Sequence, residues 1–291
     1  MTLQPTNERS KKSISMQSSE LPIVLAMTGA SGAIYAVRLL QQLLLTDQSV
    51  HLVYSPSAET VLWHELKIRM EGERSNQHDK DIHLEVNEEN IDRTHSNLND
   101  DLDLIVEATV SSSAPFGKRR QLSSALFGKK RLLLPMIEYC WPGEEKRWGR
   151  CPDAAQALSS GRLVVHHYQD YMTPIASGSF LTKGMVICPC SGATLSGVVH
   201  AAGNNLIQRS ADVHLKEHRK LILVPRETPL SVFQLENMHR AAQAGAIVLP
   251  AMPGWYHGID SIVDLIDFVV ARILDHLDVP HQLMNRWGTP S

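Results

Sequence analysis

The stretch LPIVLAMTGASGAIYAVRLLQQLLL, residues 21–45, decides the fold. Its apolar run IVLAM predicts a buried strand, the TGASG that follows predicts a tight turn, and the remainder predicts a helix. The unpaired amides of Ser31, Gly32 and Ala33 would then face outward with the positive end of the helix dipole, and we call these three amides the anion seat. The full G-x-G-x-x-G pattern of dinucleotide-binding proteins is absent. A turn whose glycines serve only the bend therefore stays an alternative.

Composition bounds the class of protein. The chain has 291 residues, 43% of them hydrophobic, which is enough for a sizeable core in one large or two ordinary domains. A net charge of -3 and a pI near 6.5 give no electrostatic case for nucleic acid or an anionic membrane as the main partner. No apolar run reaches membrane-spanning length. We expect a globular protein that binds neither nucleic acid nor membrane.

The cysteines and the first residues point to a compartment. Cys140, Cys151, Cys188 and Cys190 show neither C-x-x-C spacing nor a disulfide framework, and nothing at the start resembles a secretory signal. These features predict a reducing, cytoplasmic environment. Residues 1–20 are polar and mildly basic, which predicts a disordered tail in preference to an organelle presequence.

Strand and helix patterns alternate through most of the chain. Further strands are predicted at 50–55, 184–191, 221–225 and 246–250, and further helices at 57–68, 192–202, 205–218, 232–244 and 260–277. This alternation predicts an α/β fold, a doubly wound parallel sheet with helices on both faces in three α/β/α layers.

A polar interval interrupts this pattern. Acidic residues dominate 71–107 and basic residues dominate 117–150, which predicts a solvated insert at about 71–165 within a single domain of residues 21–291. Short strands are possible at 132–136 and 163–167. We expect removal of residues 72–160 to leave the fold intact.

Polar side chains follow several predicted strands at their carboxyl ends, where open α/β sheets bind ligands. Ser55 ends the second strand, and Arg226 and Glu227 directly follow the strand LILVP. Tyr256 lies in the loop after the next strand. Glu65, on the second helix, is by itself better explained as a solvated carboxylate.

Cations recur on two later helices. Arg209, Asp212 and Lys216 form one polar stripe, for which simple solvation is the alternative, and Arg272 on the last helix could bring a further cation to the same rim. An anion seat, several cations, an acid and a phenol suit a phosphate-bearing cofactor and a second anionic molecule. Because no Ser/His/Asp arrangement, metal cluster or phosphate loop with Lys is present, the residues predict a mononucleotide-binding α/β enzyme.

Several blocks in order give a more specific indication: TGASGAIYAVRLL, the ASGSF loop, MVICPCSGATLSGV, NNLIQRSADVHLKEHRKLILVPRETPL, AIVLPAMPGWYH, DFVVARIL and RWG. In these blocks the chain resembles the flavin prenyltransferase family, the UbiX-type proteins, through residues 21–68 and 168–288. The resemblance implies a flavodoxin-like sheet, reduced FMN, dimethylallyl phosphate as prenyl donor and a homo-oligomer, a dodecamer with sites between subunits. It also implies a UbiD-type decarboxylase that receives the prenylated FMN.

The resemblance also assigns residues. Those implied to hold FMN are Gly29, Ala30, Ser31, Ser55, Ser191, Gly192, Ala193, Thr194 and Arg226. Those implied to grip the donor phosphate are Lys216, Arg226, Tyr256 and Arg272. Ser31, Glu65, Lys216 and Glu227 are the implied catalytic residues, with the two glutamates handling protons, and Arg209 and Trp287 are implied to line the site. The cations stabilise phosphate as it leaves an allylic carbon, so no metal is needed, and the resulting cation is captured by flavin N5 and then C6.

Two alternatives remain at this point. The related FMN-dependent cysteine decarboxylases share the fold, but their P-x-M-N motif is absent and VPRETPL occupies the corresponding strand end. The second alternative is a non-catalytic flavin-binding subunit. The complete set of implied catalytic residues argues against this alternative. The interval 66–169 is longer than the family usually has, which bears on assembly and access to the site.

Overall fold

The computed structural model describes residues 21–68, 136–256 and 258–284, together with Arg286 and Gly288. Six parallel strands form one sheet: β1 (Ile23–Met27), β2 (Val50–Tyr54), β3 (Leu163–His166), β4 (Gly184–Cys190), β5 (Leu221–Pro225) and β6 (Ile247–Val248). Their order is β3-β2-β1-β4-β5-β6. This is the Rossmann order, and without β3 it is the flavodoxin-like order. The predicted doubly wound sheet is confirmed.

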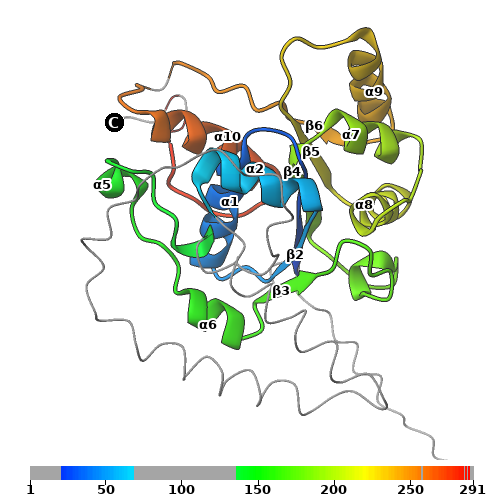
Figure 1. Cartoon of the computed structure of the whole chain (residues 1–291), viewed down its shortest axis with the longest axis horizontal. Helices are drawn as coiled ribbons and strands as arrows, with labels where there is room; N and C mark the ends of the chain where they lie inside the picture. Colours follow the sequence, from blue (N-terminus) through cyan, green and yellow to red (C-terminus); the bar gives the residue numbers. More distant parts are fainter. Residues whose placement is uncertain (1–20, 69–135, 257, 285, 287, 289–291) are drawn as a thin grey trace, which may run out of the picture.

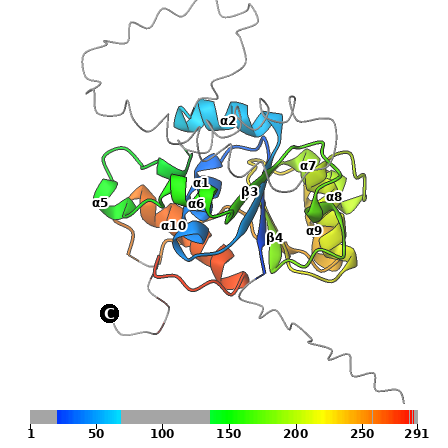
Figure 2. The same ribbon diagram turned by 90° about the horizontal axis from the view of Figure 1, so that it is seen from below.

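Helices cover both faces of the sheet (Figures 1 and 2). One face carries α1 (Ala33–Leu45), α2 (Pro56–Leu66), α5 (Glu145–Trp148), α6 (Ala154–Ser159) and α10 (Ile262–His276). The other carries η2 (Pro174–Ala176), α7 (Gly192–Val199), α8 (Leu206–Lys216) and α9 (Val232–Gln243). The fold therefore has the three α/β/α layers that the sequence predicts.

Alternation within β1 explains why its sequence reads as a continuous apolar run. Ile23, Leu25 and Met27 pack in the layer of α1 and α10, whereas Val24 and Ala26 pack in the layer of α7 and α8. All five residues are at most 1% exposed. A parallel strand covered by helices on both faces must be apolar at every position.

Helix starts follow the expected capping chemistry, with small shifts in the bounds. Ser55 caps α2: its Oγ accepts a hydrogen bond from Ala58 N at 3.2 Å, so the helix begins at Pro56, one residue earlier than predicted. Similarly, Ser261 caps α10, which begins two residues later than predicted. The helix bounds are therefore set by the residue whose side chain reaches back to the free amides.

The sheet changes winding direction between β1 and β4. The chain leaves β1 for α1 on one face and leaves β4 for α7 on the other, and open α/β sheets bind ligands in a crevice at the carboxyl ends of two such strands. Thr28 ties its two sides together, because its Oγ1 donates to Pro189 O at 2.7 Å and accepts from Ser191 N at 2.8 Å. This brace fixes the width of the crevice.

The end of the predicted insert differs from the structure. Residues 163–166 form strand β3, which pairs with β2, so the expected boundary near 165 falls inside the sheet. Met136, Ile137 and Trp148 are at most 1% exposed and pack against the core. Met136 is helical, and the rest of the possible strand at 132–136 lies outside the described residues. Residues 136–160 are therefore not wholly a solvated insert, and a deletion of residues 72–160 would also remove Trp148 from the core.

Candidate functional site at the switch point of the sheet

The anion seat lies at the start of α1, and a carboxylate of the chain itself occupies it. Gly32 N donates to Glu65 Oε1 at 3.0 Å and to Oε2 at 2.9 Å, and Ala33 N donates to Oε2 at 2.8 Å. Gly32 adopts a φ of 106°, which a side chain would strain, and this conformation turns the amides outward. Glu65 is therefore more than a solvated helix carboxylate, although its side chain is exposed.

A second helix start lies across the crevice from the anion seat. Ser191 caps α7, where its Oγ accepts a hydrogen bond from Thr194 N at 3.3 Å and donates to Thr194 Oγ1 at 3.0 Å. Gly192 and Ala193 are the first residues of this helix. The positive ends of two helix dipoles thus meet at the switch point, and each favours an anion.

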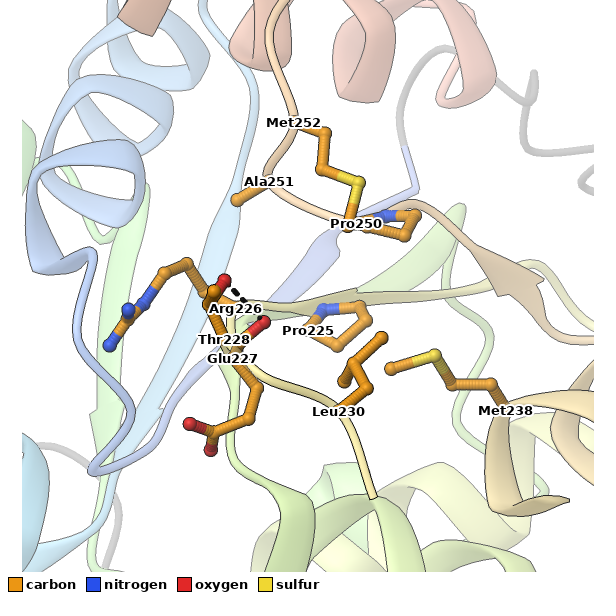
Figure 3. A pocket seen from close by; sticks show the side chains of 9 residues that line it. All are labelled: Pro225, Arg226, Glu227, Thr228, Leu230, Met238, Pro250, Ala251 and Met252. Carbon is orange, nitrogen blue, oxygen red and sulfur yellow. Dashed lines mark hydrogen bonds between the residues drawn. The ribbon is translucent and has the colours of Figure 1, made fainter. Parts of the chain in front are cut away.

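Arg226 joins the carboxyl end of β5 to the anion seat. Its Nε donates to Ser31 O at 3.1 Å, so the guanidinium lies beside the turn that carries the seat. A cavity of about 50 Å³ lies beside Arg226 and Glu227. In Figure 3 these two residues lie on one side of it, and Met238 and Met252 lie on its other sides. This cavity is lined by Pro225, Arg226, Glu227, Thr228, Leu230, Met238, Pro250, Ala251 and Met252. Arg226 and Glu227 therefore lie at the carboxyl end of β5 and line this cavity, and their role in binding a ligand stays a prediction.

Tyr35 is a residue of this region that the sequence reasoning missed. A Cβ placed on Gly32 would lie 3.2 Å from Tyr35 Cδ2 and 3.7 Å from Arg226 Cγ, so the phenol ring and Arg226 flank the same turn. Burial raises the pKa of Tyr35, with the nearby Glu65 acting in the same direction and Arg226 opposing. The feature of the sequence that could have pointed to Tyr35 is its position in the first helical turn after TGASG.

The structure gives a reason for glycine at position 29 that does not involve a ligand approaching the backbone. A Cβ at this position would lie 2.4 Å from Ser57 Cβ, at the start of α2. Real Cβ atoms do not approach a neighbour this closely, so any larger residue must displace α2 or the turn. Ser55, which caps the same helix, is buried at 7% exposure, and its backbone amide donates to Met27 O at 3.0 Å. The two loops after β1 and β2 therefore pack directly on each other.

Three predicted site residues, all of them cations, lie on the helices α8 and α10. Lys216 ends α8, close to the amino end of β4, where Met185 N donates to Lys220 O at 2.9 Å. Arg209 on the same helix donates to Ala176 O and to Asp212, each at 3.1 Å. Arg272 pairs with Asp275 at 2.8 Å in the last part of α10. One copy of the chain brings Arg226 to the turn that carries the seat, whereas the hydrogen bonds of Arg209 and Arg272 go to other groups.

Tyr256 lies in the loop after β6 and is 61% exposed. Its ring makes an edge contact with Phe268 of α10 at a centroid distance of 5.8 Å. Trp287 lies outside the described residues. Within the described part of the chain, no three His, Cys, Asp or Glu side chains gather closely enough to hold a metal ion. No helix among these residues is long and apolar enough to cross a membrane.

Comparisons with known proteins agree with this geometry. The Flavoprotein family matches residues 11–112 and 149–274. The flavin prenyltransferase UbiX of Alkalihalophilus pseudofirmus is 38% identical over 266 residues, which are 91% of this chain and 96% of that protein.

Two solved structures extend the likeness to three dimensions. A crystal structure of AnUbiX in complex with FMN and dimethylallyl pyrophosphate is 29% identical, has a TM-score of 0.60, and covers 94% of this chain and all of its own. A dodecameric FMN-dependent UbiX-like decarboxylase from Escherichia coli O157:H7 is 28% identical, has a TM-score of 0.57, and covers 93% of this chain and all of its own. The chain belongs to the UbiX-type flavin prenyltransferases of the Flavoprotein family.

Proposed function

We propose that this protein joins the dimethylallyl group of dimethylallyl phosphate to N5 and C6 of reduced FMN, making prenylated FMN. The observation that carries the proposal is the crevice at the switch point, where two helix N-termini and Arg226 meet in a chain of this family. Two phosphate-bearing molecules need two sets of donors, and the crevice offers them on its two sides.

The donor set fits FMN. The start of α7 supplies backbone amides of Gly192 and Ala193 with the hydroxyl of Thr194 beside them, and this is the chemistry that binds a phosphate. The turn from Gly29 to Ser31 lies opposite, with Ser55 below it. Reduced FMN supplies the nucleophilic N5 and C6 of its ring system. The protein's residues hold it and exclude water.

The second molecule is the prenyl donor, and its phosphate is a leaving group. Arg226 lies at the rim in this chain, whereas Lys216 and Arg272 lie on the helices α8 and α10. We infer that Lys216, Arg272 and Arg209 reach the crevice of another copy in a homododecamer, with Tyr256 near the rim. Fixed cations stabilise charge on a departing phosphate without a metal ion.

Proton handling is assigned to the acids at the rim. Glu227 follows β5 directly and is exposed beside the cavity, and Glu65 lies against the anion seat. Ser31 belongs to the turn that carries the anion seat, so its hydroxyl lies in the same turn. A carboxylate at each side of the crevice can return a proton to phosphate or take one from the flavin.

The product is a cofactor for a UbiD-type decarboxylase, and we place the protein in the cytoplasm. An FMN-dependent cysteine decarboxylase is less well supported, because the relative at 38% identity is a prenyltransferase. The test transfers the small-molecule fraction from this protein, reduced FMN and dimethylallyl phosphate to a cofactor-free UbiD-type decarboxylase. We expect decarboxylation only when all three components were present. Activity that develops without the prenyl donor would refute the proposal.

A further inference from the structure

Residues 136–151 form a segment that is held firmly against α1. The side-chain amide of Gln41 donates to the carbonyls of Ile137 and Tyr139 at 2.9 and 2.8 Å. Arg38 NH1 donates to Trp148 O at 2.7 Å, and the guanidinium lies 4.6 Å from the centre of the Trp148 ring. Backbone positions along this segment are therefore well defined relative to one another.

The thiol of Cys151, at the end of this segment, lies beside the backbone that leads into Cys140. Cys151 Sγ lies 3.5 Å from Tyr139 O and 3.8 Å from Glu138 O. Because the carbonyl carbon of Tyr139 is bonded to the nitrogen of Cys140, the Cys151 thiol lies against the peptide group that begins Cys140. The Cys140 thiol is near enough to raise the pKa of the Cys151 thiol. Both cysteines are free and half-buried.

Cys140 and Cys151 lie in a common environment, in which the same groups shift the pKa values of both thiols. Burial raises the pKa of Cys140 and of Cys151, the neighbouring Cys140 raises the pKa of Cys151 further, and Arg38 opposes both shifts. Both groups are thus thiols at neutral pH, and oxidation is slow without an excess of oxidant. Cys188 and Cys190 differ, since they are at most 1% exposed and pack in layers on opposite faces of the sheet.

We propose that Cys140 and Cys151 are a redox-active dithiol that closes to an intramolecular disulfide by exchange with a small-molecule disulfide such as oxidised glutathione. A thiolate attacks the oxidant and forms a mixed disulfide, and the second cysteine then displaces the other glutathione. One sulfur–sulfur bond forms in the protein and one breaks in the oxidant, which leaves as two thiols. The ring encloses α5 and the buried Trp148. Closing it locks the segment onto α1.

The test uses the full chain, equilibrated with glutathione buffers of rising oxidised fraction, then alkylated and mapped by mass spectrometry. We expect a Cys140–Cys151 cross-link, with Cys188 and Cys190 alkylated only after denaturation. The oxidised protein should melt about 5–10 °C higher, because the link restricts the unfolded chain. Cys140→Ser and Cys151→Ser should each lose the melting shift and hold glutathione as a mixed disulfide.

Other results would overturn the proposal. These are glutathione on both cysteines of the unmodified chain without a cross-link, a cross-link that involves Cys188 or Cys190, or a cross-link without a rise in melting temperature. The double variant Cys140→Ser/Cys151→Ser separates effects of the thiols from damage to packing. It should melt as the reduced protein does, at every glutathione ratio.

Discussion

Glu65 and Gly32 are joined by a forked hydrogen bond, in which the Gly32 amide donates to both carboxylate oxygens at 3.0 and 2.9 Å. Ala33 N adds a third bond at 2.8 Å. The start of α1 therefore binds a carboxylate of α2 in the position where we expect a ligand's anion. An incoming phosphate must displace Glu65, and the displaced carboxylate becomes available at the same rim.

Removal of Glu65 should strengthen phosphate binding. In Glu65→Ala the seat amides lose their internal acceptor, so affinity for inorganic phosphate should rise about tenfold, the value of one charge-assisted hydrogen bond. Glu65→Gln should show a smaller rise, because its single acceptor oxygen carries no charge. Calorimetric titration of the full chain measures this. Glu59→Ala is the matched control, since it removes an acid from the same helix. Unchanged or weaker phosphate binding in Glu65→Ala would show that the carboxylate does not compete.

Substitutions at Gly29 test whether this position must be glycine because of Ser57 or because of the flavin. Gly29→Ala should lower FMN occupancy, because its Cβ would meet Ser57 Cβ at 2.4 Å and push the turn away from α2. Gly29→Ala/Ser57→Gly removes that contact and should restore occupancy, measured by flavin absorbance after gel filtration. Ser57→Gly alone controls for the loss of the hydroxyl. If the double variant binds no more FMN than Gly29→Ala, the flavin and not Ser57 sets the requirement.

Mixed assemblies test whether Lys216 acts in another copy's site. Lys216→Ala leaves phosphate charge uncompensated, and Glu227→Gln removes an ionisable group, so each variant should lose on the order of a hundredfold or more in prenyl transfer. Subunits of the two variants, exchanged into one assembly, should recover roughly a quarter of the sites, those that draw Lys216 and Glu227 from different copies. Single-turnover formation of prenylated flavin measures this. Mixtures as inactive as their parents would place both residues in one chain's site and refute the inference that Lys216 acts in another copy.

Acid should weaken the fold through His214. Its Nδ1 donates to Ser210 O at 2.7 Å, so its Nε2 accepts from Thr182 Oγ1 at 2.8 Å only while the ring is neutral. Burial lowers the pKa of His214 to about 4. The unfolded chain therefore takes up the proton first, and stability that is complete above pH 6.5 falls as the pH drops toward 4. The loss should reach about 3 kcal/mol.

Urea unfolding at several pH values measures this loss, with His214→Asn as the comparison. The variant starts less stable at pH 7 and should have a shallower dependence between pH 6.5 and 4. His51, whose pKa burial also lowers, contributes a slope of the same sign in both proteins. Identical slopes in the two proteins would exclude His214 as the source.

The sequence predicts the sheet well because each strand and helix of the core carries its own periodicity and caps. β5 has the predicted bounds, and Ser55 reaches the rim as expected. β3 agrees with the short strand given as possible at 163–167, and it was only a possibility because a four-residue edge strand after a charged interval has little pattern of its own. Trp148 was missed for a similar reason, since its burial depends on Arg38 and Gln41, far away in sequence.

The candidate site, like the fold, has some features that follow from the local sequence and others that depend on contacts between distant residues. Residues that directly follow a strand, such as Arg226, are placed by the topology alone. The bond between Glu65 and Gly32 spans 33 positions and follows from how α2 packs on the turn, which no local pattern reports. Lys216 could not be placed for a different reason. A polar stripe on a helix indicates a functional surface, but it does not indicate in which subunit's site the residues of that surface act.

The most direct test of the proposed reaction is the mass of the flavin released from the purified protein after anaerobic incubation with reduced FMN and dimethylallyl phosphate. The account predicts a flavin heavier than FMN by one isoprene unit, formed in amounts that follow protein concentration. Dimethylallyl pyrophosphate, the ligand named in the AnUbiX complex, serves as the second donor in the comparison. Release of unmodified FMN from a protein that binds both molecules would contradict the account.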